Sequence, residues 1–177
     1  MTQQNRHENE VMRTNAREES MSHGWVPVYL LLMMILPFVS ACRTVPSPYE
    51  TGLVETEVRS VIHRQMEDWN KGDIARFMEG YRQDGDTRFA SGDSVLKGWT
   101  AVLERYHRTY PDDAAMGKLT FSEVDVTVIS SDATLVFGHW HLQRENDEPS
   151  GLFTLLFRKT KEGWRIVHDH TSAARSD

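Results

Sequence analysis

The sequence predicts an α+β domain in which three helices pack on one face of a strongly curved, mainly antiparallel sheet. Three observations lead to this fold class. Apolar residues recur at helical spacing over 53–70 and alternate at strand spacing over 118–129. Two further apolar runs, 151–158 and 163–172, are joined by a short turn into a hairpin. Because the helical patterns come first and the long strands follow, the class is α+β rather than alternating α/β.

The three helices have recognisable ends. The first, over 53–70, has apolar residues on one side and charged residues on the other, and a Lys-Gly-Asp turn ends it. Asp73 can cap the second helix, a short one over 74–81. The third helix runs over 98–110 and stops at Pro111, because proline cannot continue a helix. Asp73 and Asp84 are therefore interpreted as capping and turn residues rather than as acids of a catalytic site.

The strands form two groups. A short pair, 87–91 and 94–96, is joined by a tight Gly-Asp turn. Four longer strands follow as a meander: 118–129, 133–143 and the two strands of the closing hairpin. The last strand ends in the polar residues His168, Asp169 and His170, which could serve a ligand if they face a pocket.

The N-terminal part resembles a bacterial lipoprotein signal. Residues 1–24 are polar, and 25–41 form an uncharged apolar run. This run is shorter than the about 20 residues that a membrane-spanning helix needs and fits a signal peptide better. It ends Val-Ser-Ala before Cys42, the single cysteine of the chain, as in a lipobox. The alternative is an uncleaved signal anchor with an idle cysteine.

Four segments follow from this interpretation. They are a leader and signal peptide (1–41), a tether (42–52), the folded domain (53–173) and a tail (174–177). Lipidated Cys42 would hold the domain on a lipid bilayer of the bacterial cell envelope, outside the cytoplasm. The chain has 177 residues and a formal net charge of −6, which argues against a nucleic-acid partner. One cysteine excludes an intramolecular disulfide.

Several short motifs resemble the nuclear transport factor 2-like superfamily, in its SnoaL-like, ketosteroid-isomerase-like branch. They are WNKGD at 69–73, KGW at 97–99, GHW at 138–140 and GWRIVHDHTS at 163–172. The last motif also resembles the association domain of the calcium/calmodulin-dependent kinases. The resemblance implies a cone-shaped fold with a pocket between the helices and the concave sheet, commonly as a homodimer. It implies no particular reaction, because the fold hosts enzymes, binding proteins and assembly modules.

The residues that could line such a pocket are mostly aromatic, with a few polar groups. The candidates are His168, Asp169 and His170, then His141, and the rings of Trp69, Phe89, Trp99 and Phe153. The rings are equally typical of a core, as is Tyr81. We expect a domain that binds a small apolar molecule or serves as an assembly module, with no demonstrable catalytic residues and no cofactor. The alternative is a small isomerase, cyclase or hydratase that uses pocket His and Asp residues.

Two His-x-His pairs offer a further alternative, a metal site. Residues two apart on a strand share a face, so His139 points with His141, and His168 with His170. Imidazole is a common zinc ligand, but half-buried histidines of a sheet are the favoured interpretation. If His168 and His170 line the pocket, strict alternation turns Asp169 to the other face of the strand.

Overall fold

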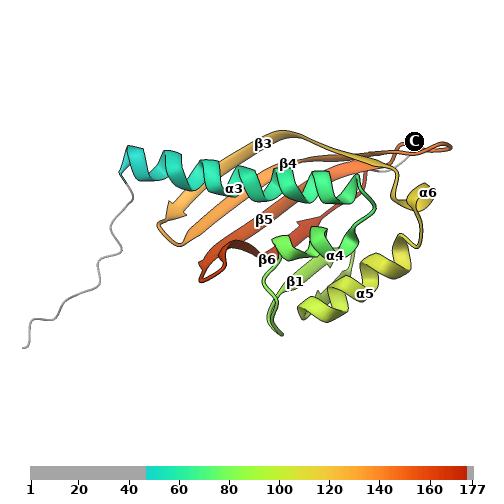
Figure 1. Ribbon diagram of the computed structural model, residues 1–177, viewed down its shortest axis with the longest axis horizontal. Helices are drawn as coiled ribbons and strands as arrows, with labels where there is room; N and C mark the ends of the chain where they lie inside the picture. The colour runs from blue at the N-terminus through green and yellow to red at the C-terminus, as the bar shows by residue number, and fades with distance from the viewer. Residues whose placement is uncertain (1–46, 175–177) are drawn as a thin grey trace, which may run out of the picture. The chain divides into compact units, whose positions relative to one another are not determined.

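A computed structural model describes residues 47–174 (Figure 1). The predicted signal peptide, the lipidation site Cys42 and residues 42–46 of the predicted tether lie outside the described residues. Within 47–174, no helix is long and apolar enough to cross a membrane.

The longest helix, α3 (Pro48–Trp69), starts earlier than the sequence pattern indicated. Ser47 caps it, since the Ser47 hydroxyl accepts a hydrogen bond from the Glu50 amide and the Glu50 carboxylate accepts one from the Ser47 amide. Pro48 occupies the first turn, where its missing N–H costs nothing. The prediction of an extended tether up to residue 52 is therefore wrong over its last five residues, 48–52.

The remaining helices are short. They are α4 (Ile74–Phe77), which continues as the 3₁₀ turn η2 (Met78–Gly80), then α5 (Trp99–Thr109) and α6 (Asp113–Met116). Asp73 caps α4, as predicted, by accepting a hydrogen bond from the Arg76 amide. The sequence analysis did not identify α6, whose N-terminus Asp112 caps.

The six strands form one sheet in the order β2-β1-β6-β5-β4-β3. Their bounds are β1 (Arg88–Ser91), β2 (Ser94–Lys97), β3 (Lys118–Ser130), β4 (Ala133–Gln143), β5 (Ser150–Thr160) and β6 (Gly163–Thr171). Four pairings are antiparallel and β1 pairs with β6 in parallel. The predicted fold class, helices on a curved and mainly antiparallel sheet, is confirmed.

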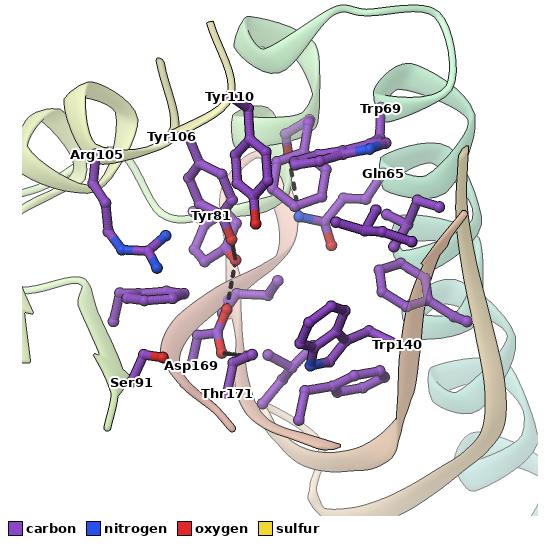
Figure 2. Close-up of a pocket in the computed structure, with 18 of the residues that line it drawn as sticks. Gln65, Trp69, Tyr81, Ser91, Arg105, Tyr106, Tyr110, Trp140, Asp169 and Thr171 are labelled. Atoms are coloured by element: carbon purple, nitrogen blue, oxygen red, sulfur yellow. Dashed lines mark hydrogen bonds between the residues drawn. The ribbon is translucent and has the colours of Figure 1, made fainter. Parts of the chain in front are cut away.

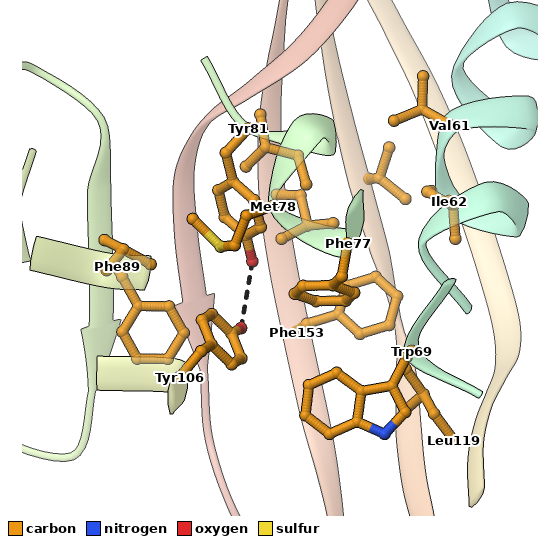
Figure 3. Packing of buried hydrophobic residues seen from close by; sticks show 14 of the residues in the cluster. Val61, Ile62, Trp69, Phe77, Met78, Tyr81, Phe89, Tyr106, Leu119 and Phe153 are labelled. Carbon is orange, nitrogen blue, oxygen red and sulfur yellow. Dashed lines mark hydrogen bonds between the residues drawn. The ribbon is translucent and has the colours of Figure 1, made fainter. Parts of the chain in front are cut away.

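The helices cover one face of the sheet, and the core lies between the two layers (Figures 1 and 3). Trp69 of α3, Phe77 of α4 and Tyr106 of α5 are all buried and pack in T-shaped, edge-to-face contacts, with ring centroids 5.2 to 6.0 Å apart. Asn70, just past α3, ties the helix to the sheet. Its amide donates to the Leu119 carbonyl at 3.0 Å and accepts from the Leu119 amide at 2.7 Å.

Candidate functional site

A cavity of about 190 Å³ lies between the helices and the inner face of the sheet (Figure 2). The largest group of lining residues is aromatic: Trp69, Phe77, Tyr81, Phe89, Tyr106, Tyr110, Phe121, Trp140 and Phe153. Aliphatic side chains from β3 to β6 complete the apolar wall. The polar lining residues are few: Gln65, Ser91, Arg105, Asp169, Thr171 and Ser172. Such a wall suits an apolar molecule with one or two polar groups.

Asp169 is the polar centre of this cavity, and only 3% of it is exposed. One carboxylate oxygen accepts a hydrogen bond from the Tyr81 hydroxyl at 2.7 Å, and the other accepts one from the Thr171 hydroxyl at 2.6 Å. Tyr106 lies 3.3 Å from Tyr81, oxygen to oxygen. Because Tyr81 has one proton and gives it to Asp169, Tyr106 is the donor to Tyr81. The result is a chain of hydroxyls that ends on a buried carboxylate.

Burial raises the pKa of Asp169 above its ordinary value. Hydrogen bonds from Thr171 and Tyr81, and the charges of His168 and Arg105, act in the opposite direction and do not outweigh burial. A carboxyl group with a raised pKa can take up or release a proton closer to neutral pH than an exposed aspartate can.

Tyr81 and Tyr106, the two tyrosines of this hydrogen-bonded chain, stay protonated. Burial, followed by the charge of Asp169, raises the pKa of Tyr81 well above its ordinary value, and the same two causes raise the pKa of Tyr106. The two hydroxyls are therefore hydrogen-bond donors throughout the range in which Asp169 titrates.

A second polar group faces the cavity from the helices. The Gln65 side-chain nitrogen donates to the Phe77 carbonyl at 3.1 Å, which fixes the orientation of the amide. The amide oxygen accepts no hydrogen bond from the described residues and points toward the cavity (Figure 2). The cavity thus offers an acceptor from α3 and an acid–tyrosine chain from the opposite wall.

The prediction that His168 and His170 line the pocket is wrong, and a β-bulge in β6 is the reason. Leu156 of β5 pairs with His168 while the next residue, Phe157, pairs with Ile166, so Val167 is an extra residue in β6. The bulge reverses the alternation. Asp169 therefore faces the cavity, whereas His168 and His170 do not line it.

The other pair of histidines also lies away from the cavity. On β4, His139 and His141 alternate with the cavity-lining Trp140, and each is half-buried beside a glutamate: His139 lies 3.3 Å from Glu123, and His141 lies 3.4 Å from Glu148. The prediction that His141 lines the pocket is therefore wrong.

The four histidines do not converge on one point. Among the described residues, no three or more His, Cys, Asp or Glu side chains gather as metal ligands would.

Three predicted rings, those of Trp69, Phe89 and Phe153, line the cavity. Trp99 does not, and its indole nitrogen donates instead to the Met78 carbonyl at 2.9 Å. Sequence reasoning missed Gln65, Arg105 and Tyr106. Tyr106 carried a signal, because it lies on the apolar side of its helix. Gln65 carried one too, because it lies three residues after Ile62 and four before Trp69 on the apolar side of its own helix. Nothing local marked Arg105 as inward-facing.

Comparison with known proteins places these features in a family context. A family model described as a SnoaL-like domain matches residues 58–176. The chain is similar to an NTF2-like protein of unknown function from Shewanella oneidensis MR-1, with 34% sequence identity over 67% of this chain and 98% of that one, at a TM-score of 0.64. No curated protein matches the chain.

Two more distant structures share the fold. One is an NTF2-like superfamily protein from Salmonella enterica serovar Typhimurium LT2, 23% identical over 71% of this chain and 94% of that one, with a TM-score of 0.58. The other is a ketosteroid isomerase-like protein from Erwinia carotovora atroseptica SCRI1043, 16% identical over 68% of this chain and 96% of that one, with a TM-score of 0.56.

Proposed function

The chain belongs to the SnoaL-like domain family, within the NTF2-like superfamily, and on this premise we propose that its cavity binds a small, mainly apolar molecule carrying a polar group. The observation that carries the proposal is the aromatic cavity with Asp169 buried in its wall. A cavity of about 190 Å³ suits a single-ring compound, since an apolar cavity of about 150 Å³ in another protein binds benzene.

The polar groups would orient this molecule. A hydroxyl or amide donor on the ligand would reach the Gln65 oxygen, and an acceptor would reach the Tyr106 hydroxyl by diverting it from Tyr81. A ligand group that leaves Asp169 without a partner would bind less well, because a buried polar group left unpaired costs about 1–3 kcal/mol.

Benzyl alcohol is a suitable first probe, followed by NMR of methyl groups that line the cavity, such as those of Leu142, Leu155 and Ile166. We expect saturable shifts of these methyl groups. Ala173→Trp should weaken binding several-fold because Ala173 is an exposed residue of the cavity lining. Ala174→Trp is the matched control, since Ala174 is exposed and does not line the cavity. No saturable shift, or equal binding by both variants, would refute the proposal.

A second candidate is proton transfer catalysed by Asp169. A buried carboxylate with a raised pKa, in contact with an apolar cavity, suits a general base. Such a base could isomerise a small β,γ-unsaturated ketone by moving the proton from the α carbon to Asp169 and then from Asp169 to the γ carbon. The product is a conjugated enone with strong ultraviolet absorbance. Turnover that Asp169→Asn leaves unchanged would exclude this role.

We also propose that lipidated Cys42 tethers the domain to a membrane of the bacterial cell envelope. The support is the apolar run that ends Val-Ser-Ala-Cys, shortly before the folded domain begins at Ser47. Wild type should partition with membranes after cell fractionation, and Cys42→Ser should lose both processing and membrane association. Unchanged processing and partitioning in the variant would contradict the tether.

A further inference from the structure

Arg105 is a half-buried cation in the cavity wall. It lies on α5, and its guanidinium carbon is 4.3 Å from the centroid of the Phe89 ring and 5.7 Å from that of Tyr106. Stacking on the ring faces holds the guanidinium in place and leaves its N–H groups directed outward in one plane. None of these groups makes a hydrogen bond or ion pair with another described residue.

Five other arginines among the described residues are paired with acids. Those with a carboxylate partner are Arg59, Arg76, Arg82, Arg144 and Arg158. A partly desolvated cation without an anion is costly, and this cost falls when an anion occupies the site. Arg105 differs from these five in having donors available for a ligand, and among the described residues it is the arginine that lines this cavity.

Asp169 is not the anion that pairs with Arg105. Its two oxygens already accept hydrogen bonds from Tyr81 and Thr171, and no ion pair joins it to Arg105 among the described residues. Ser91 of β1 also lines the cavity and adds a hydroxyl on the same side as Arg105 (Figure 2). The guanidinium and this hydroxyl lie beside an aromatic wall, an arrangement that suits an anionic group attached to an apolar body.

We propose that the ligand is a small monocarboxylate, with its carboxylate bound by Arg105 and its apolar part held among the aromatic rings of the cavity. This inference rests on the proposed binding function and names the ligand class. A carboxylate can take two parallel hydrogen bonds from one guanidinium, which a neutral amide of the same shape cannot. The volume of about 190 Å³ limits the apolar part to about one ring.

Benzoate and benzamide test the inference, because they have nearly the same shape and differ in charge. Their dissociation constants would be measured by NMR titration of the full chain at pH 7.5, with benzyl alcohol as a neutral reference. We expect benzoate to bind at least about tenfold more tightly than benzamide, the effect of a charge-assisted hydrogen bond. Arg105→Gln should abolish this preference. Arg105→Lys, which keeps the charge and loses the paired donors, should retain part of it.

Arg108→Gln is the matched control, since Arg108 lies on the same helix, is exposed and does not line the cavity. It should keep the wild-type preference. Equal affinity for benzoate and benzamide, or a preference that survives Arg105→Gln, would overturn the inference while benzyl alcohol binding still supports the cavity as a binding site. Absence of binding by all three probes would overturn the inference and the proposed function together.

Discussion

Replacing Asp169 by Asn should change how the stability of the domain depends on pH. Asp169 is buried, and burial raises its pKa above the about 3.9 of an unfolded chain. The asparagine amide has nearly the same shape. It can accept from Thr171 and donate to the Tyr81 oxygen, after which Tyr81 can rotate to donate to Tyr106. The substitution therefore removes the ionisable group and leaves the hydrogen-bonded chain intact.

The sign follows from proton binding. At a pH between the unfolded and the folded pKa, Asp169 is protonated in the folded protein and ionised in the unfolded chain. The folded state then binds one proton more, so the free energy of unfolding falls as the pH rises, by about 1.4 kcal/mol per pH unit. Above the folded pKa the effect is complete and constant. The wild type should thus lose stability relative to Asp169→Asn as the pH rises through this window.

Urea unfolding of both proteins from pH 4 to pH 8 measures this difference. Subtracting the two curves removes the contributions of the other acids, several of which have lowered pKa values and act in the opposite sense. Asp93→Asn, at an exposed position beyond β1, is the control and should follow the wild-type curve. A flat difference between wild type and Asp169→Asn would refute the reasoning. A difference that grows in favour of wild type with rising pH would mean that the hydrogen bonds hold Asp169 ionised.

Three further substitutions test the packing. Gly138→Ala should destabilise the domain by about 1–3 kcal/mol, because the new Cβ would lie 2.5 Å from Cζ of Phe153. Asn70→Ala should cost about 1–3 kcal/mol, because it leaves the amide and carbonyl of Leu119 without their partner; urea unfolding measures both. Phe137→Glu should convert the predicted homodimer into a monomer in sedimentation experiments, since this residue is 40% exposed on the outer face of the sheet.

Each of these has a matched control. Gly52→Ala in α3 meets no atom within 4 Å and should stabilise the helix by about 0.5–1 kcal/mol. Asn146→Ala, in an exposed loop, should leave stability unchanged. Val95→Glu, at another exposed position, should leave the oligomeric state unchanged. Wild-type stability in Gly138→Ala or Asn70→Ala would contradict the packing described. A wild type that sediments as a monomer at tens of micromolar would contradict the homodimer.

Much of the fold could be predicted because periodicity reports burial directly. Phe89 and Phe153 line the cavity as expected because large rings on an apolar strand face are buried wherever the sheet is covered. The ends of the helices were harder to predict from the sequence. The start of α3 at Pro48 depends on the capping interaction between Ser47 and Glu50, which prevails over the extended structure that two prolines suggest.

The site itself was less predictable. Alternation assigns side chains to faces only while the pairing is regular, and nothing in the residues around Val167 signals that β6 has an extra, unpaired residue at this point of its pairing with β5. That uncertainty reversed the roles of Asp169 and its two neighbouring histidines. Arg105 was missed for a different reason, because its position depends on contacts with Phe89, which is distant in sequence.

The single extra residue at the Val167 bulge decides which side chains of β6 face the cavity, without changing the rest of the fold. If Val167 paired with Leu156 instead of forming the bulge, His168 and His170 would turn inward and Asp169 outward, while the hairpin and the helices that cover it keep their places. An acidic pocket would become an imidazole pocket without any substitution. Homologues should therefore be compared by the face that each side chain occupies, because an alignment column after the bulge can pair an inward residue with an outward one.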